Sequence, residues 1–421
     1  MSVVVQKFGG TSVGDADRIR NVAGRIAQTA AQGYRVVVVV SAMGDTTDEL
    51  ERLAAQITDD PPPREMDLLM SSGERISMAL VAMALHAAGL NSESFTGSQA
   101  GIITDALHRR ARIADIRPRR ILESLDRGMI PIVAGFQGVS TETADVTTLG
   151  RGGSDATAVA LAAALEAEVC EIYTDVEGVY TADPRLVPNA RKLHAVSYEE
   201  MLEMSASGAR VLFTRSVELA RNHGVLVHVR SSFTDAGGTY ISEEDERMME
   251  KAIISAVTHD TTEAKITLFA VPDRPGIAAS VFGPLARKGV NVDMIVQNVS
   301  HQGHTDISFT VPRSDVSAAT EVIQRVADET GADGYAVDEQ IGRVSLVGAG
   351  MRTHPGVAAD MFACLAEAGV NIEMISTSAI RISVIVREDQ VAQAVRAIHD
   401  HFRLAEEVVY RAEHPEAEPG G

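Results

Sequence analysis

The stretch that decides the fold, residues 147–175, reads TTLGRGGSDATAVALAAALEAEVCEIYTD. It predicts a glycine-rich turn over residues 150–153, a helix over about residues 156–166 and a strand over residues 169–174. Glycine adopts positive φ and lets the backbone approach a ligand closely. The turn is therefore a candidate for ligand binding as well as a connection.

The start of the predicted helix carries side chains that suit an anion. Ser154 and Asp155 stand where a helix N-cap belongs, and a helix N-terminus offers N–H groups to an anionic ligand. Arg151 can bind a carboxylate or a phosphate with two parallel hydrogen bonds. Taken alone, the pattern fits equally well a tight turn followed by a capped helix.

A second glycine loop lies near the start of the sequence. Residues 3–6 predict a strand, the loop KFGGTS follows, and apolar residues at helical spacing over residues 15–31 predict a helix. The loop is not a Walker A loop, because no Gly-Lys-Ser/Thr ends it, and it is not a dinucleotide fingerprint. Lys7 stands at the carboxyl edge of the strand, where it can meet a phosphate held by the Gly9 and Gly10 amides.

Five consecutive valines at residues 36–40 are typical of a central parallel strand that is buried on both faces. Ligands of parallel sheets bind outside the carboxyl ends of the strands, so Lys7, Ser41 and Thr47 are expected at one edge. Glu74 begins a further apolar helix, over about residues 74–88. Alternatively, an acidic residue at this position only matches the helix dipole.

A long polar loop, TDVEGVYTADPR, begins at the end of the strand predicted from residue 169. With Tyr180 and the rigid Asp183-Pro184 it can hold a nucleotide base and ribose, with Arg185 near the phosphates; the alternative is an ordinary surface loop. Further strands are predicted at residues 93–95, 130–134 and 225–230. The alternation of strands and helices up to about residue 232 predicts a doubly wound, mostly parallel α/β domain.

The C-terminal part contains an internal repeat. PGIAA and GVNVDMI, from residues 275 and 289, match PGVAA and GVNIEMI, from residues 355 and 369. Each copy is predicted to fold as βαββαβ, with a first strand at residues 265–271 or 343–347 and a second helix at residues 316–329 or 389–402. Two such units suggest a paired sensor of a small ligand; the alternative is a duplicated scaffold without a ligand.

Composition restricts the class of protein. A chain of 421 residues accommodates two or three domains. The net charge of -20 argues against binding to nucleic acid or to an anionic membrane. Cys170 and Cys364 lie in apolar segments and are expected to be reduced core residues. Because no signal-peptide pattern and no apolar run of about 18 residues are present, we expect a cytoplasmic protein.

Taken together, KFGGTS, SGER, TTLGRGGSD, TDVEGVYTADPR and the tandem repeats resemble the aspartate kinases of the amino-acid kinase family over nearly the whole chain. The resemblance implies a mostly parallel sheet sandwiched by helices, followed by two ferredoxin-like βαββαβ ACT domains. It implies transfer of the ATP γ-phosphate to the side-chain carboxylate of L-aspartate, which begins lysine, threonine and methionine biosynthesis. The implied cofactors are ATP and Mg²⁺, which binds phosphates through few protein ligands.

The resemblance also implies how the chain is divided. The expected segments are a kinase domain at residues 1–240, a linker at 241–251, ACT domains at 252–335 and 336–412, and a flexible tail at 413–421. The expected assembly is a homo-oligomer, or an α2β2 complex with a short subunit that starts at Met248 or Met249.

Roles in the kinase domain follow from the resemblance, motif by motif. Lys7 would stabilise the γ-phosphate, the glycine amides of KFGGTS would hold it, and Asp155 would orient Lys7 and assist the Mg²⁺ shell. Glu74 would bind the substrate ammonium group and Arg151 the substrate α-carboxylate. The remaining substrate and nucleotide contacts are assigned to Ser41, Thr47, Ser154, Thr174, Asp175, Tyr180, Asp183 and Arg185.

Two positions depart from the family pattern. Arg210 stands where a lysine that helps at the phosphates is usual, so its catalytic role has a different geometry. Ala379 replaces a usual glutamate, which bears on the strength of feedback inhibition by lysine and threonine. Both effectors are implied to bind between ACT-like units of paired chains. The implied contacts are Asp273, Gly276, Ile277, Asn291, Asp293, Gln297, Asn298, Ser300, Thr305, His354, Val357, Asn371, Ile372, Glu373 and Ser378.

Two other hypotheses stay open on the sequence alone. One is a kinase that acts on glutamate or N-acetylglutamate, which the tandem repeats and the Glu74/Arg151 pair disfavour. The other is a non-catalytic amino-acid sensor on a degenerate kinase fold, which the intact Lys7, Arg151 and Asp155 disfavour.

Overall fold

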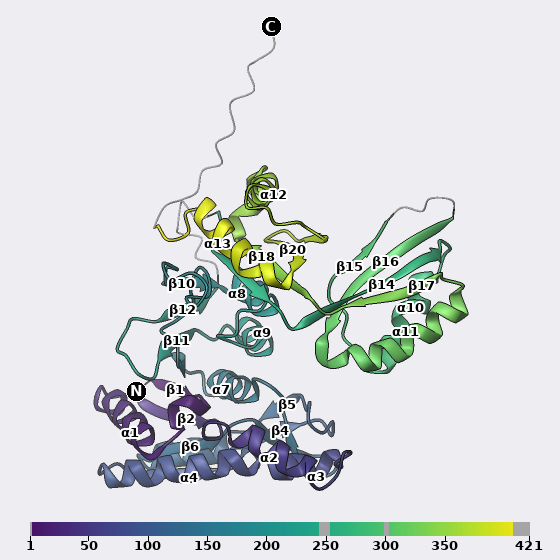
Figure 1. The fold of residues 1–421 in the computed structure, drawn as a ribbon. Coiled ribbons are helices and arrows are strands. Elements are labelled where there is room, and N and C mark those ends of the chain that lie inside the picture. Colours follow the sequence, from purple (N-terminus) through teal and green to yellow (C-terminus); the bar gives the residue numbers. More distant parts are fainter. Residues whose placement is uncertain (1, 244–252, 299–302, 407–421) are drawn as a thin grey trace. The chain divides into compact units, whose positions relative to one another are not determined.

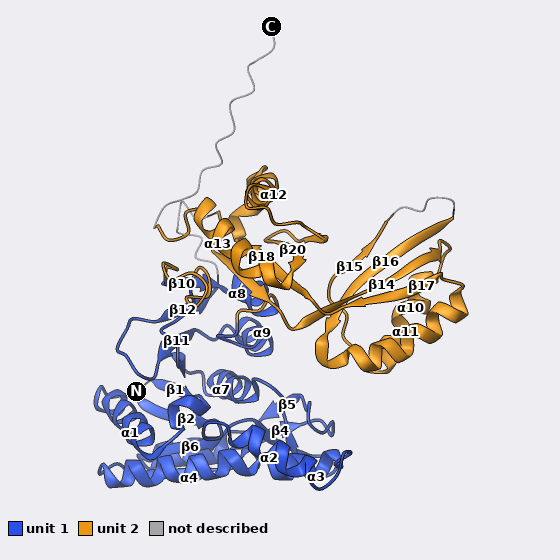
Figure 2. Ribbon diagram, in the orientation of Figure 1, with its two compact units in different colours: residues 1–180, 192–206, 210–247 blue, residues 181–191, 207–209, 248–421 orange. Residues whose placement is uncertain are grey.

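Residues 2–243, 253–298 and 303–406 are described by the computed structural model, in which the chain divides into two units (Figure 2). The first unit comprises Met1–Tyr180, Lys192–Ala206 and Arg210–Arg247, and the second comprises Thr181–Arg191, Ser207–Ala209 and Met248–Gly421. Part of the predicted nucleotide loop therefore belongs to the second unit. Most of the predicted linker, including Met248 and Met249, and the whole predicted tail lie outside the described residues.

An eight-stranded sheet organises the first unit (Figure 1). Its strands follow the order β10-β12-β11-β9-β1-β2-β6-β3, and every neighbouring pair is parallel except β11 and β12. The bounds are β1 Val3–Phe8, β2 Arg35–Val40, β3 Ser92–Phe95, β6 Ile130–Ala134, β9 Val169–Thr174, β10 Ala195–Ser197, β11 Val227–Ser231 and β12 Thr239–Ser242. The mostly parallel sheet expected from the sequence is confirmed.

Helices cover both faces of this sheet (Figure 1). Helices α1 (Ala16–Ala31) and α4 (Ser72–Ala87) pack on one face, where their apolar residues join Val38 and Val40 of β2. Helix α7 (Gly153–Ala164) packs on the other face of β1, β2 and β9. Successive strand residues point to opposite faces, so the valine run of β2 supplies both cores. The remaining helices are α2 Thr46–Ala55, α3 Pro63–Met70, α5 Gly97–Ala100, α6 Arg119–Asp126, α8 Tyr198–Ala206 and α9 Thr214–His223.

A smaller sheet in the first unit was not expected from the sequence. Its order is β5-β4-β7-β8, with bounds β4 Ile102–Thr104, β5 Ile113–Ile116, β7 Gln137–Ser140 and β8 Val146–Thr148. These strands have only three or four residues each, too few for a clear period of two. Strand β8 leads directly into the glycine turn before α7.

One helical stretch among the described residues, Pro63–Ala87, is long and apolar enough to cross a membrane. Half of its most apolar window is buried inside the protein, and α4 packs on β3 and β6. Because a buried core helix passes the same test, this is weak evidence for a membrane span.

The first repeat of the second unit folds as βαββαβ, as the sequence predicts. Its sheet has the order β15-β16-β14-β17. The elements are β14 Glu263–Pro272, α10 Ile277–Arg287, β15 Ile295–Gln297, β16 His304–Pro312, α11 Val316–Thr330 and β17 Gly334–Asp338. The predicted domain boundary after residue 335 falls inside β17, because this strand pairs with β14 through Asp338.

The second repeat differs from the prediction in its fourth strand. Its own elements are β18 Ile341–Val347, α12 Val357–Glu367, β19 Met374–Thr377, β20 Arg381–Arg387 and α13 Val391–His401. The sheet has the order β13-β18-β20-β19, and β13 (Ala256–Asp260) precedes the first repeat in the chain. It pairs antiparallel with β18 and so completes that edge of the sheet. The interpretation that each repeat supplies all its own strands is therefore wrong for the second repeat.

Candidate active site

Lys7 and Asp155 form a nearly buried ion pair at the carboxyl end of β1. The Lys7 Nζ atom lies 2.6 Å from the Asp155 Oδ1 atom, and the exposed fractions of the two side chains are 11% and 6%. Lys7 is the next-to-last residue of β1, and Asp155 lies in the first turn of α7. A buried ion pair adds little net stability, because both charges lose their hydration. The pair therefore marks this sheet edge as a candidate site where charge is used.

The glycine turn starts α7 three residues earlier than the predicted start at about residue 156. Gly152 is the N-cap with φ 71°, and the helix begins at Gly153. Ser154 and Asp155 consequently lie inside the first turn, so their predicted N-cap position is wrong. A Cβ atom on Gly152 would lie 2.2 Å from the Phe213 ring, and this close packing explains the glycine. Asp155 still benefits from the positive end of the helix dipole.

The KFGGTS loop packs tightly against the loop after β2. A Cβ atom on Gly10 would lie 2.8 Å from the Ala42 carbonyl oxygen, and the Gly44 N–H donates to the Gly10 carbonyl at 3.0 Å. The Gly9 N–H donates to the Tyr173 carbonyl at 3.1 Å. That amide is committed to the sheet, so the prediction that it holds a phosphate is not met in this structure.

Glu74 is a buried carboxylate, and one of its two oxygens lacks a hydrogen-bond partner in the described part of the chain. Its Oε1 atom accepts from the Ala42 N–H at 3.2 Å, and its Oε2 atom has no hydrogen-bond partner among the described residues. Burial raises the pKa of Glu74 to about 7. An ammonium group is the ligand that would restore the ionised form most directly.

Two of the predicted substrate residues, Ser41 and Ser154, lie at the carboxyl edge of the large sheet. The Ser41 N–H donates to the Phe8 carbonyl at 3.1 Å, which places the loop with Ser41 beside Lys7. A Cβ atom on Gly135, after β6, would lie 2.8 Å from the Ser154 hydroxyl oxygen. Thr47 lies in the first turn of α2 and is partly exposed. Arg151 is exposed in the glycine turn.

The predicted nucleotide residues are divided between the two units. Thr174 is the last residue of β9, and Asp175 follows it. The Thr174 hydroxyl donates to the Asp175 carboxylate at 3.0 Å. They share the edge with Lys7, because β9 runs parallel to β1. Tyr180 is partly exposed in the first unit. Arg210, also in the first unit, is exposed before α9.

Asp183 and Arg185 lie in the second unit and bind each other. The Arg185 Nη2 atom lies 2.6 Å from the Asp183 Oδ2 atom. Hydrogen bonding from Arg185 lowers the pKa of Asp183 below its ordinary value. Arg185 is thus occupied by its neighbour, and the predicted phosphate contact would require exchange of that partner.

The predicted effector residues lie in the second unit, and several already have structural partners. Asp293 is paired with Arg343, and Glu373 is paired with Lys265. The Thr305 hydroxyl donates to the Asn298 carbonyl at 2.8 Å. Ile277 and Val357 are buried first residues of α10 and α12. Asp273, Gly276, Asn291, Gln297, Asn298, His354, Asn371 and Ser378 are exposed, Ile372 is partly buried, and Ser300 lies outside the described residues.

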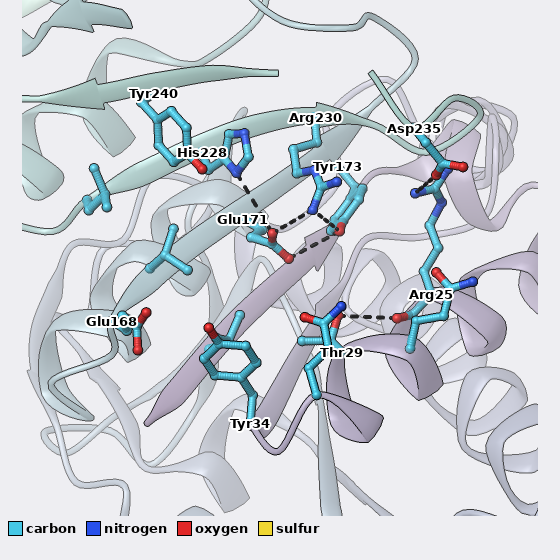
Figure 3. A pocket seen from close by; sticks show the side chains of 15 residues that line it. Arg25, Thr29, Tyr34, Glu168, Glu171, Tyr173, His228, Arg230, Asp235 and Tyr240 are labelled. Atoms are coloured by element: carbon cyan, nitrogen blue, oxygen red, sulfur yellow. Dashed lines mark hydrogen bonds and ion pairs between the residues drawn. The ribbon is translucent and has the colours of Figure 1, made fainter. Parts of the chain in front are cut away.

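A cavity of about 300 Å³ lies on the opposite face of the large sheet (Figure 3). In it Glu171 accepts from Arg230 at 2.9 Å and from the Tyr173 hydroxyl at 3.1 Å, and both side chains point toward Glu171 in Figure 3. The Gln6 amide donates to Glu171 and to Thr29 of α1. Since Gln6 and Lys7 are neighbours on β1, they face opposite sides of the sheet. The cavity is therefore separate from the Lys7–Asp155 site.

Sequence reasoning missed three polar residues near these sites that are buried or partly buried: Asp67, Glu171 and Arg215. Asp67 and Glu171 are 0% and 7% exposed, and Arg215 is partly buried. Their hydrogen-bond partners come from segments far away in the chain. A single charged residue in an amphipathic segment gives no local signal of such partners.

No group of three or more His, Cys, Asp or Glu side chains placed to hold a metal ion occurs in the described ranges. Any divalent cation in the candidate site would therefore need ligands from a bound phosphate or from water, with Asp155 as the nearest carboxylate to Lys7.

Comparisons with known proteins cover nearly the whole chain. The amino acid kinase family matches residues 2–231, and the ACT domain matches residues 270–326 and 344–402. An aspartokinase from Mycolicibacterium smegmatis is 56% identical over 416 residues, which cover 97% of this chain and 99% of the relative.

Two solved structures of E. coli aspartokinase III have the same fold. The complex with aspartate and ADP, in the R-state, has a TM-score of 0.79 and 28% identity, and the match covers 95% of this chain and all of that chain (100%). The complex with lysine and aspartate, in the T-state, has a TM-score of 0.71 and 28% identity, and the match covers 94% of this chain and 99% of that chain.

Proposed function

The chain belongs to the amino acid kinase family and, within it, to the aspartate kinases, and we propose that it phosphorylates the side-chain carboxylate of L-aspartate with ATP to give 4-phospho-L-aspartate. The observation that carries this proposal is the buried Lys7–Asp155 ion pair at the sheet edge that also holds Glu74. A cation and a buried carboxylate with one oxygen unpartnered among the described residues, at one edge, suit a phosphate and an amino acid.

The chemistry requires little beyond positioning and charge. The side-chain carboxylate of aspartate is already ionised at pH 7, since its ordinary pKa is about 4, so no general base is needed. The barrier comes from bringing two anions together and from charge on the transferring phosphoryl group. Lys7 would neutralise part of that charge, and Asp155 would keep the Lys7 ammonium group directed at the phosphate.

The amino-acid substrate would be held at its two charged ends. Glu74 would bind the ammonium group through the oxygen that lacks a hydrogen-bond partner within the described ranges, and Arg151 would bind the α-carboxylate. Holding both ends fixes the side-chain carboxylate relative to the phosphate, which is worth several kcal/mol of activation free energy. Ser41, Thr47 and Ser154 lie around the same edge and would complete the substrate contacts.

The nucleotide would lie along the ends of β1 and β9. Thr174, Asp175 and Tyr180 are the first-unit residues proposed to contact it. Mg²⁺ would be held mainly by the phosphates and water, with Asp155 as the proposed protein contribution, and it would supply charge neutralisation between the phosphates.

Regulation is proposed to act through the second unit. The product opens the route to lysine, threonine and methionine, and we propose lysine and threonine as inhibitors that bind the ACT repeats. The lysine complex of E. coli aspartokinase III supports lysine as an effector in a relative of the same fold. We further propose a cytoplasmic homo-oligomer, or an assembly with a short subunit that begins in the linker.

The test is an ATP-dependent phosphorylation assay with trapping of the acyl phosphate by hydroxylamine. Aspartate, glutamate and N-acetylglutamate are offered separately, each with and without lysine plus threonine. We expect a trapped product with aspartate alone, and less of it when both effectors are present. A product formed faster from either glutamate compound, or none from aspartate, would refute the proposed substrate.

A further inference from the structure

We propose that Arg215 and Asp67 are positioning residues, which hold the turn that carries Arg151 so that Arg151 can bind the substrate carboxylate. This inference rests on the proposed function, in which Arg151 contacts the α-carboxylate of aspartate. It assigns to two residues outside all the sequence motifs a role in the selection and orientation of the amino-acid substrate.

The turn that carries Arg151 contains two backbone positions that favour glycine. Gly150 and Gly152 have φ values of 78° and 71°, and Arg151 lies exposed between them. Within the turn, the Gly153 N–H donates to the Gly150 carbonyl at 3.0 Å. Because glycine has more conformational freedom to lose than any other residue, contacts from outside the turn have to fix the direction of Arg151.

Arg215, near the start of α9, forms a hydrogen bond with Leu149, the residue just before the glycine turn. Its Nη1 atom donates to the Leu149 carbonyl at 2.8 Å, and its Nη2 atom donates to the Ala111 carbonyl at 2.9 Å. The Ala111 N–H in turn donates to the Thr148 carbonyl at 2.9 Å. One planar guanidinium group thus joins the end of β8, the loop between β4 and β5, and α9, which a lysine ammonium group cannot do with the same geometry.

Asp67 of α3 forms a hydrogen bond with Thr148 in the same segment. It is 0% exposed, and its carboxylate accepts from the Thr148 hydroxyl at 2.5 Å and from the Arg109 N–H at 3.1 Å. The His108 Nδ1 atom lies 2.6 Å from its other oxygen. A Cβ atom on Gly150 would lie 3.0 Å from the Arg109 carbonyl. Asp67 therefore fixes the loop against which the turn rests.

Arg215 and Asp67 hold two neighbouring residues of one short segment. Arg215 holds the backbone at Leu149, and Asp67 holds the side chain of Thr148. Loss of either would let the turn shift while Lys7 and Asp155 stay fixed by β1 and α7. The expected result is weaker aspartate binding with little effect on ATP binding.

The experiment measures steady-state kinetics of the full chain, with aspartate and ATP varied separately. For Arg215→Ala we expect the KM for aspartate to rise about tenfold or more, since a 1 Å misplacement can cost a hundredfold, with the KM for ATP within about twofold of wild type. Arg215→Lys should restore part of the loss. Arg221→Ala is the matched control, because Arg221 lies on the same helix in a surface pair 3.6 Å from Glu199.

A double-mutant cycle with Arg151→Ala separates this inference from the proposed function. If Arg215 acts through Arg151, Arg215→Ala causes no further rise in the aspartate KM of Arg151→Ala. A rise as large as in wild type, or equal rises in the KM for both substrates, would overturn the inference alone. If Arg151→Ala leaves the aspartate KM unchanged, the carboxylate assignment fails and the inference fails with it. Should Arg215→Ala not fold, Asp67→Asn provides the same cycle.

Discussion

Arg343 of the second repeat is ion-paired with Asp293 of the first repeat. The relationship is reciprocal: Glu373, which matches Asp293, is paired with Lys265 near the start of the first strand of the other repeat. The matching acidic residues of the two repeats therefore each pair with a basic residue on the first strand of the other repeat. Asp293 and Glu373 were predicted as effector contacts, and their present partners suggest that an effector would compete with these ion pairs.

Arg343→Met should destabilise the second unit. Arg343 is 1% exposed and lies 3.1 Å from Glu263 as well as beside Asp293, so its removal leaves carboxylates facing each other. We expect the free energy of unfolding to fall by about 3–5 kcal/mol, the usual cost of removing one partner of a buried pair. Chemical denaturation of the full chain measures this loss.

Arg325→Ala is the control for that measurement, because Arg325 and Glu321 form an exposed helical pair at 3.7 Å. Its removal should change the free energy of unfolding by less than about 0.5 kcal/mol. An equally small effect of Arg343→Met would show that the ion pairs of Arg343 contribute little to the stability of the second unit.

Lys7→Met should abolish most turnover while the protein stays folded. The methionine keeps the length of the side chain but removes the charge beside Asp155. We expect kcat to fall by about 10²–10³, as for loss of one group that stabilises transition-state charge. Kinetics with saturating ATP and aspartate measure it, and Lys288→Met, at an exposed pair in the second unit, serves as the control. Near-normal turnover of Lys7→Met would remove Lys7 from the mechanism.

Glu74 should make aspartate binding depend on pH. Burial raises its pKa to about 7, and only the ionised carboxylate attracts the substrate ammonium group. The KM for aspartate should therefore fall as pH rises from 6 to 8, by up to about tenfold per pH unit below the pKa. Glu74→Gln should have a higher KM that no longer changes in this range.

The same group should affect stability with the opposite trend. The folded state holds a proton on Glu74 between its ordinary pKa of about 4.5 and its raised pKa of about 7, so the free energy of unfolding should fall as pH rises through this window. Thermal unfolding without ligands, compared for wild type and Glu74→Gln, measures the difference. A steeper decline in Glu74→Gln would contradict the assignment.

Gly10→Ala and Gly24→Ala should change stability in opposite directions. A Cβ atom at Gly10 would lie 2.8 Å from the Ala42 carbonyl oxygen, whereas one at Gly24 on α1 meets nothing within 4 Å. We expect Gly24→Ala to stabilise the protein by about 0.5–1 kcal/mol. Gly10→Ala should destabilise the protein by about 1–3 kcal/mol and lower turnover, because it pushes the Lys7 loop away from Ala42. Denaturant midpoints and kcat together test the pair.

Asn371→Ala should weaken inhibition without changing uninhibited turnover. Asn371 is exposed in the second repeat and belongs to the GVN motif. If it contacts an effector, the inhibitory concentration of lysine plus threonine should rise several-fold, within the range of about 5–150-fold that single couplings span. A parallel measurement on Arg325→Ala should show wild-type inhibition. An unchanged response in Asn371→Ala would remove this residue from the effector site.

The large sheet was predictable because its signals are local. The valine run of β2 reports burial on both faces, and strands alternate with periodic helices around it. The strands of β5-β4-β7-β8 were missed because they are short and carry Asp, Gln and Thr. The partner of β18 was also missed, because β13 joins it across the whole first repeat.

The candidate site was predictable only as a set of motifs. Lys7, Asp155 and Glu74 stand out because charged residues beside glycines or at helix starts carry a recognisable pattern. The hydrogen bond from the Gly9 N–H to the Tyr173 carbonyl was not predictable, because it depends on a strand far away in the chain. Arg215 was hidden for the same reason: its acceptors are backbone carbonyls of Leu149 and Ala111, which no sequence pattern marks.

The account depends on Lys7 and Arg151 gathering a phosphate and an amino acid at one sheet edge. A crystal structure with aspartate and a non-hydrolysable ATP analogue tests it most directly. We predict a phosphate oxygen within hydrogen-bond distance of the Lys7 ammonium group, the aspartate α-carboxylate on Arg151 and its ammonium group on Glu74. Finding either ligand instead on the other face of the sheet, in the cavity beside Glu171, would contradict the account.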